Sequence, residues 1–269
     1  MSLDAMIPIR YRDRAIARLA VRSIRRFVEG VRRIYVVSAE DPCIDDTYFV
    51  NETAFPFSIE DVRRILDVED RAGWYLQQLI KLYFPIVETG CLEHVFVVDA
   101  DTIFLRPVRF IEDGRVVFSV SDQFHQPYFD HMQRMHPMLA KVTPYSGIAH
   151  CMIFTKQWLT ELMKLVEEHH KQTPFWRSFL YAVDPKYREL SGASEYEIYL
   201  NFCLDRHAEE LLVKRFNWQN ATRLSDVRPR KYDYVSFHWY NRDANIDYEQ
   251  LSRLIFSKSS ILRWGFRVI

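Results

Sequence analysis

The hydrophobic pattern of the first forty residues predicts a strand, a helix and a second strand. The apolar run over residues 3–9 stops at a charged turn, as expected of a buried strand. Over residues 14–28 the apolar side chains recur at helical spacing with arginines opposite, which is typical of an amphipathic helix. The β-branched run over residues 33–38 predicts the next strand. This order favours a parallel α/β sheet.

The remaining pattern adds further strands and helices. We expect strands over residues 95–98, 116–120, 149–154 and 234–239, and helices over residues 58–70, 74–84, 156–170 and 191–204. Pro85 is expected to end the helix over 74–84, because proline lacks the N–H that a helix interior needs. The polar, aromatic and proline-broken segment 121–145 predicts a long loop or lid. No repeat or linker interrupts the chain, so we expect a single domain over residues 1–269.

The composition narrows the classes of protein and ligand. Of the 269 residues, 48% are hydrophobic and 27% are charged, as in an ordinary soluble globular protein. Lysine plus arginine equals aspartate plus glutamate, at 36 each, so no overall charge directs the chain to nucleic acid. The seven glycines form no glycine-rich phosphate loop. Four scattered cysteines, with no signal peptide and no 18-residue apolar span, predict a cytoplasmic protein without a transmembrane segment.

The stretch VFVVDADTIFLRP, residues 95–107, places Asp99 and Asp101 directly after a predicted strand. Ligands of open α/β sheets bind beyond the carboxyl ends of the strands. Residues i and i+2 of an extended chain face the same side, so we expect both carboxylates to face one bound object. Two carboxylates held close together repel, and a divalent cation that also holds a diphosphate would remove the conflict. The alternative is that they cap a turn or pair with Arg106.

Two families share this local pattern. Haloacid-dehalogenase-like phosphatases carry a strand followed by D-x-D-x-[TV], as in VVDADTIF, and there Asp99 would be a nucleophile and Asp101 an acid. That motif normally opens the chain, whereas here it follows a complete strand–helix–strand unit, and no paired aspartates follow a later strand. The order of elements before the D-x-D instead resembles a GT-A glycosyltransferase. Four segments in this order are similar to a little-characterised bacterial and viral group of glycosyltransferases: GWYLQQLIKL (73–82), VVDADTIFLRP (97–107), SGIAHCMIF (146–154) and GASEYEIYLNF (192–202).

This resemblance implies a fold and an activity. The fold would be GT-A, an α/β architecture with a mostly parallel central sheet flanked by helices, with a nucleotide-sugar-binding half over 1–120 and an acceptor-side half over 121–269. The activity would be metal-dependent transfer of a sugar from a nucleotide-diphosphate donor to a glycan or other hydroxyl acceptor, with Mn²⁺ or Mg²⁺. Two alternatives stay open: a haloacid-dehalogenase-like phosphatase, and a non-catalytic nucleotide-sugar-binding protein.

The resemblance also implies metal ligands. Asp99 would lie near the ribose or the metal, and Asp101 would ligate the metal directly. His238, at the end of an apolar strand-like run, is the candidate third ligand, because related GT-A families complete the site with a histidine near the C-terminus. A core or surface histidine is the alternative. A rival metal site would use His125, His131 and His136, although their spacing suits neither one helix face nor a strand.

Donor contacts follow from the same resemblance. Gln77 and Lys81 share a helix face at i and i+4, and Lys81 would reach a phosphate. A solvated helix face is the alternative. By analogy, Pro8 and Arg10 after the first strand would receive the nucleotide base. Sugar or base would stack on aromatic side chains, for which the candidates are Trp239, Tyr240 and Trp74.

The acceptor side contains two glutamates in the stretch SGASEYEIY. Glu197 fits the S-x-x-E capping box that begins at Ser194, so we expect its side chain to cap the helix. Glu195 has no such explanation and is expected to point into the cleft mouth as the general base of an inverting transferase. Glu197 and Asp122 are the second choices for that role. The acceptor pocket would be lined by His150 and Ser146.

Overall fold

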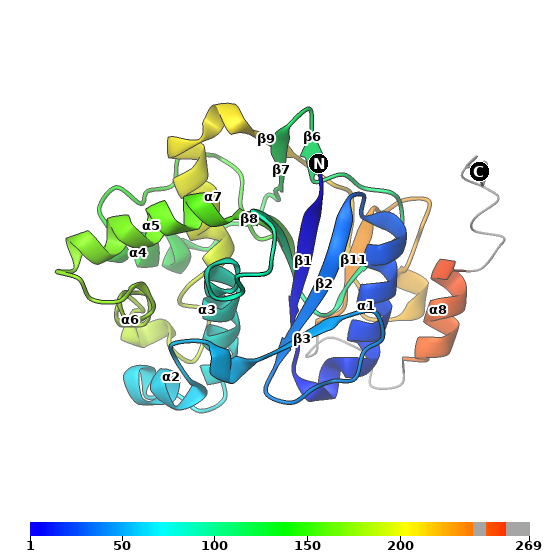
Figure 1. Ribbon diagram of the computed structural model, residues 1–269, viewed down its shortest axis with the longest axis horizontal. Coiled ribbons are helices and arrows are strands. Elements are labelled where there is room, and N and C mark those ends of the chain that lie inside the picture. Colours follow the sequence, from blue (N-terminus) through cyan, green and yellow to red (C-terminus); the bar gives the residue numbers. More distant parts are fainter. Residues whose placement is uncertain (239–245, 257–269) are drawn as a thin grey trace.

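A central sheet of five strands organises the molecule. The computed structural model describes residues 1–238 and 246–256, and the strand order is β3-β2-β1-β4-β8 (Figure 1). The first four run parallel, and β8 pairs antiparallel with β4. The predicted mostly parallel sheet is confirmed. The strands are β1 (Leu3–Pro8), β2 (Val31–Ser38), β3 (Tyr48–Asn51), β4 (His94–Val98) and β8 (Cys151–Thr155).

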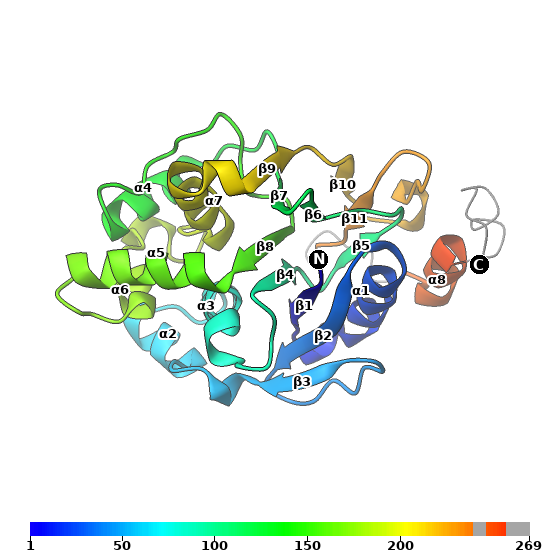
Figure 2. The same cartoon turned by 45° about the horizontal axis from the view of Figure 1, so that its top comes forward.

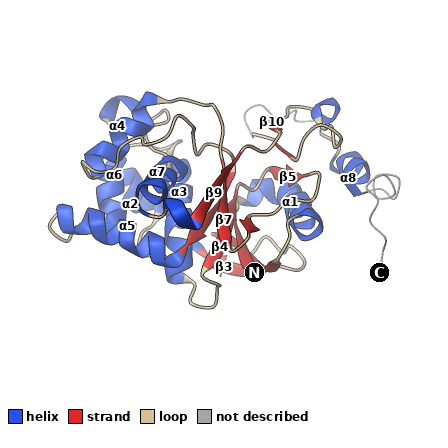
Figure 3. Cartoon of the chain, turned by 90° about the horizontal axis from the view of Figure 1, so that it is seen from above, coloured by secondary structure: helices blue, strands red, loops and turns tan. Residues whose placement is uncertain are grey.

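Helices cover both faces of this sheet. Seen from above, α1 (Arg14–Phe27) and α8 (Tyr248–Phe256) lie on one side and the remaining helices on the other (Figure 3). The second group is α2 (Ile59–Leu66), α3 (Ala72–Val87), α4 (Gln126–Met135), α5 (Lys156–His169), α6 (Phe175–Tyr181) and α7 (Glu195–Arg206). In the described part of the chain, no helix is both long enough and apolar enough to span a membrane.

Two smaller sheets of three strands each extend the central one. The first begins just after β4 and consists of β5 (Thr102–Phe104), β10 (Trp218–Asn220) and β11 (Tyr234–Ser236). The second consists of β6 (Ile111–Glu112), β7 (Arg115–Ser119) and β9 (Leu211–Lys214). Because β5 pairs with β11, the chain just beyond the D-x-D motif lies beside residues 234–236.

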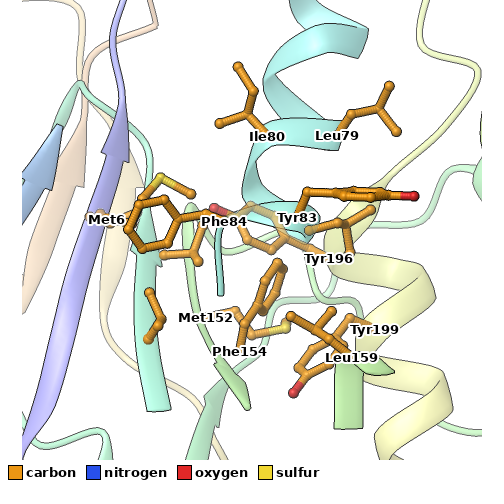
Figure 4. Packing of buried hydrophobic residues seen from close by; sticks show 14 of the residues in the cluster. Met6, Leu79, Ile80, Tyr83, Phe84, Met152, Phe154, Leu159, Tyr196 and Tyr199 are labelled. Atoms are coloured by element: carbon orange, nitrogen blue, oxygen red, sulfur yellow. The ribbon is translucent and has the colours of Figure 1, made fainter. Parts of the chain in front are cut away.

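The core has two parts. The larger cluster packs α3 and α7 against β1, β4 and β8 (Figure 4). It is dominated by large apolar side chains such as Met6, Tyr83, Phe84, Met152, Phe154 and Tyr199. The smaller cluster joins α1 and α8 to β5 and β11. Burial on this scale fixes α3, α7 and the end of β4 relative to one another.

Two sequence predictions about helices are wrong. Pro85 does not end α3, which continues to Val87, because a proline in the last turn costs few intrahelical hydrogen bonds. The segment 121–145 is not a continuous loop, since α4 occupies ten of its residues. Pro127 lies in the first turn of α4, where a missing N–H is tolerated, and the helix is held by its buried side chains Phe129, Met132 and Met135.

Candidate active site

Asp99 and Asp101 lie in a turn beyond the carboxyl end of β4. The backbone N–H of Thr102 donates to the carbonyl of Asp99 at 3.1 Å, so the chain folds back between β4 and β5. The expected extended alternation is therefore wrong. The two carboxylates are nevertheless close enough to repel, since the charge of Asp99 contributes to a raised pKa at Asp101. The position at the edge of the sheet is as predicted.

Asp99 is surrounded by side chains that donate to it. Lys81 Nζ donates to Oδ1 at 2.5 Å, and the Tyr196 hydroxyl donates to the same oxygen at 3.4 Å. His150 Nδ1 donates to Oδ2 at 3.2 Å. Burial alone would raise the pKa of Asp99, but the charge of Lys81 and the contact with His150 outweigh it and hold the pKa well below its usual range. Asp99 is therefore a carboxylate already satisfied by protein groups.

Lys81 joins two helices through this carboxylate. It comes from α3, is 3% exposed, and donates to Glu195 Oε1 of α7 at 2.7 Å as well as to Asp99. Burial would lower its pKa, but the two carboxylates raise the pKa well above the usual range. The alternative of a solvated helix face is thus wrong for Lys81. Gln78 on the same helix accepts from the backbone N–H of Glu195 at 3.1 Å, while Gln77 is partly exposed (Figure 2 shows α3 and α7 on the same side of β1 and β4).

Asp101 has a different environment. The Ser236 hydroxyl donates to its Oδ1 at 3.0 Å, and Phe237 N–H donates to its backbone carbonyl at 3.0 Å. Burial, together with the negative charge of Asp99, raises the pKa of Asp101 to about 6. Arg106 forms an ion pair with Asp233 at 2.8 Å. Asp101 is thus held as a carboxylate whose charge is poorly compensated.

Two histidines lie next to each other beside this pair. The ring centroids of His150 and His238 are 4.9 Å apart, and His238 follows directly on the two residues that bond to Asp101. Burial and the neighbouring His150 lower the pKa of His238 to about 4, so its imidazole is neutral, the form that binds metals. Nε2 of His150 is buried without a hydrogen-bond partner.

The predicted ligands do not form a complete protein metal site. Within residues 1–238 and 246–256, no three or more His, Cys, Asp or Glu side chains are grouped so as to hold a metal ion. The rival metal site of His125, His131 and His136 is therefore wrong. His125 and His131 instead contact separate backbone carbonyls, those of Ser191 and Phe179, each at 2.8 Å.

The two glutamates of α7 differ from their predicted placement. Ser194 caps the helix as expected, accepting from Glu197 N–H at 3.3 Å. The side chain of Glu197, however, does not complete the capping box, because it accepts from the Ser146 hydroxyl and from Gly147 N–H. Glu195 is 4% exposed and bound to Lys81, so it lies inside the site and not at an open mouth. Burial raises the pKa of both glutamates.

The other candidates lie around this centre. Pro8 ends β1 and is buried, and the Arg10 guanidinium after it lies against Gly73 of α3, where an added Cβ would be 1.9 Å from Nη2 of Arg10. Asp122 is exposed and paired with Arg215 at 2.7 Å. Trp239 lies outside the described residues. Nothing in the structure assigns a role to these residues.

Sequence reasoning missed several residues of this site. Tyr196 lies between the two predicted glutamates, and its neighbours in the motif were the only signal for it. Trp218 contacts the His150 ring edge-on at 4.8 Å, and Ser236 bonds to Asp101. Trp218 in β10 and Ser236 in β11 are far along the chain from the residues that they contact, so no local pattern identifies them.

Comparison with known proteins agrees with this architecture. The model of a family of unknown function, DUF6492, matches residues 1–249. No curated protein sequence gives a significant match. Among solved structures, the crystal structure of mouse xyloside xylosyltransferase 1 in its apo form is similar, with a TM-score of 0.50 and 11% sequence identity over 90% of this chain and 100% of that one. At this identity the likeness bears on the fold alone, and the predicted GT-A fold is confirmed.

Proposed function

We propose that this chain, which belongs to the DUF6492 family of unknown function, is a metal-dependent glycosyltransferase that moves a sugar from a nucleotide-diphosphate donor to a hydroxyl acceptor. The observation that carries the proposal is the meeting of Asp99, Asp101, Lys81 and Glu195 beyond the carboxyl end of β4. The fold shared with a xylosyltransferase supports the reaction class.

The residues around Asp101 fit a divalent cation. The carboxylate of Asp101, with its raised pKa, is an oxygen ligand suited to Mn²⁺ or Mg²⁺, and the neutral imidazole of His238 is a nitrogen ligand suited to a transition metal such as Mn²⁺. These two would hold the metal, with diphosphate oxygens completing its shell, while Asp99 stays with its three donors. When bound, the cation would neutralise the charge that develops on the departing diphosphate.

Lys81 is suited to contact the donor phosphates as well. An ammonium group has three N–H donors, and two of those of Lys81 go to Asp99 and Glu195. Nζ also lies 4.5 Å from the centroid of the Tyr196 ring, so a donor phosphate would have to approach it beside that ring. Arg10 and Gln77 remain the candidates for the nucleotide side of the same pocket, and Pro8 for the base.

Glu195 is the candidate base. Burial raises the pKa of Glu195 despite the neighbouring Lys81, and a carboxylate with a raised pKa is a stronger base. In an inverting reaction Glu195 would accept the proton of the acceptor hydroxyl. His150 would border the acceptor. Asp122, already paired with an arginine at the surface, is the weaker choice.

Thermal denaturation with UDP, GDP and their sugars, with and without Mn²⁺, tests this function. At a ligand concentration about 100-fold above Kd, we expect Tm to rise by about 5–10 °C only when metal and nucleotide are both present. Asp101→Asn should abolish that rise. Glu195→Gln should retain binding and lose donor turnover.

Other outcomes would select the alternatives. Turnover of a generic phosphate ester that is lost in Asp99→Asn would favour the phosphatase. Metal-dependent nucleotide binding without turnover on any acceptor would favour a non-catalytic binding protein. Tm unchanged by every nucleotide with Mn²⁺ would refute the proposed transferase.

A further inference from the structure

Three consecutive residues at the start of α7 contact three separate elements. Glu195 accepts from Lys81 of α3, and the Tyr196 hydroxyl donates to Asp99 after β4. Glu197 accepts from Ser146 and Gly147, in the segment that leads into β8. Successive helix residues point about 100° apart, so each of the three faces a different direction. The first turn of α7 is therefore a junction between the parts of the candidate site.

Both carboxylate oxygens of Glu197 accept hydrogen bonds from protein groups. The residue is 0% exposed, its Oε1 accepts from the Ser146 hydroxyl and from Gly147 N–H at 3.2 Å, and its Oε2 accepts from Asn201 Nδ2 at 3.3 Å. A buried carboxylate requires such donors. Because both oxygens are engaged, Glu197 is poorly suited to take a proton from an acceptor. Its contacts instead fix a piece of backbone.

That backbone is the segment 146–150, which is tied down at its first residues. Ser146 exchanges backbone hydrogen bonds with Ser121 at 2.9 and 3.0 Å. Gly147 lies directly on α7, where an added Cβ would be 2.6 Å from the carbonyl oxygen of Tyr196. Only a glycine permits this close approach.

The last residue of the segment belongs to the Asp99 site. His150 has a φ of 64°, a left-handed conformation that a non-glycine residue keeps only when its surroundings impose it. Its backbone carbonyl accepts from Asp99 N–H at 3.0 Å, and its Nδ1 donates to Asp99 Oδ2 at 3.2 Å. Five residues therefore connect Glu197 to the carboxylate at the end of β4.

We propose that Glu197 is a positioning residue: by holding Ser146 and Gly147 against α7, it fixes the 146–150 segment so that His150 faces Asp99. The contacts that support this positioning role do not depend on any assigned activity. The expected effect on turnover rests on the proposed function.

The test compares Glu197→Ala with Glu197→Gln. Alanine removes the acceptor for Ser146 and Gly147, whereas glutamine keeps an oxygen for both and loses only the bond from Asn201. The ring nitrogens of His150, followed by ¹H–¹⁵N NMR and assigned by the loss of their signals in His150→Gln, report the position of the segment directly. Asp4→Asn is the matched control, since Asp4 is also a 0% exposed, hydrogen-bonded carboxylate, at the opposite end of β1.

We expect Glu197→Ala to move the His150 signals to those of an imidazole without a fixed partner, and donor turnover to fall about 10-fold to 100-fold, as a misplaced group near a reaction centre does. Glu197→Gln should keep the His150 signals and most of the turnover, and Asp4→Asn should leave the His150 signals in place. Gly147→Ala should give the same result, because the added Cβ would push the 146–150 segment away from Tyr196 of α7. It replaces Glu197→Ala in the test if that variant does not fold.

Three results would separate the possibilities. Unchanged His150 signals in both Glu197→Ala and Gly147→Ala would overturn the positioning role. Glutamine as damaging to turnover as alanine, with the His150 signals intact, would return Glu197 to the role of base. A wild-type protein that binds no nucleotide with Mn²⁺ would remove the proposed function, yet the NMR comparison would still decide whether Glu197 holds the segment.

Discussion

The two ends of the central sheet hold carboxylates in opposite electrostatic environments. At the amino end, Asp4 of β1 accepts from Arg32 at 2.7 and 3.0 Å, from Arg33 N–H at 3.0 Å and from Leu92 N–H at 2.8 Å. Burial would raise the pKa of Asp4, but these donors outweigh it and lower the pKa. At the carboxyl end, Asp101 receives a hydrogen bond from Ser236 and its pKa rises to about 6.

The difference separates a carboxylate that is fully paired within the protein from one that is poorly compensated. Asp4 has as many strong donors as its two oxygens need, so it ties the starts of β1, β2 and β4 together. Asp101 is partly exposed and lies beside a second negative charge without such compensation, an arrangement that costs stability and is typical of ligand-binding sites. Between the two extremes stands Asp99, whose charge is balanced by Lys81.

Removing the Lys81 cation that balances Asp99 should have the largest effect on the free energy of unfolding. Lys81→Met leaves the buried Glu195 and the partly buried Asp99 without their shared cation, and breaking a buried ion pair on one side costs about 3–5 kcal/mol. The free energy of unfolding in urea measures it. Lys164→Met is the control, because its exposed i,i+4 pair with Glu168 contributes less than about 1 kcal/mol. Equally small losses of unfolding free energy in both variants would show that the Lys81 ion pairs do not stabilise the fold.

Changing the carboxylate at the amino end should cost less. In Asp4→Asn an amide N–H₂ replaces an acceptor that faces Arg32 or Leu92, and we expect a loss of about 2–3 kcal/mol. Because folding lowers the pKa of Asp4, its contribution is present above the ordinary aspartate pKa of about 4 and is lost as the pH falls through the lower folded value. Nucleotide binding should be unchanged. A loss that persists undiminished at low pH would contradict the charge-based account.

The sequence allowed the amino half of the sheet to be predicted well. The strand–helix–strand unit of β1, α1 and β2 is encoded by local apolar periodicity, which survives in the fold because α1 buries one stripe of side chains. The place of Asp99 and Asp101 at a strand end followed from the same pattern. The helix α4 was missed because Pro127 and the polar residues around it resemble a loop when read without their packing partners.

The connections within the site could not be read from the sequence. Lys81 meets Glu195 across 114 positions, and Glu197 meets Ser146 across 51. The S-x-x-E pattern identified the helix start correctly. It also predicted that the Glu197 side chain would bond to Ser194, whereas the side chain bonds to the distant Ser146 and Gly147. Periodicity fixes which face of a helix is buried and leaves open which charged group that face will meet.

Asp101→Asn should have the smallest effect on stability, and it should stabilise the protein where the other two changes destabilise it. Burial and Asp99 raise the pKa of Asp101 to about 6, so in metal-free protein its charge costs stability above that pH, and the cost disappears below the ordinary aspartate pKa of about 4. With EDTA at pH 8, Asp101→Asn should therefore raise Tm by about 2–4 °C, which corresponds to a gain of about 1 kcal/mol for this partly exposed group. At pH 4 the substitution should leave Tm unchanged. Asp122→Asn, at an exposed surface pair, should change Tm little at either pH. A destabilised Asp101→Asn at pH 8 would mean that Asp101 is satisfied as Asp4 is, and the contrast between the two ends of the sheet would lose its meaning.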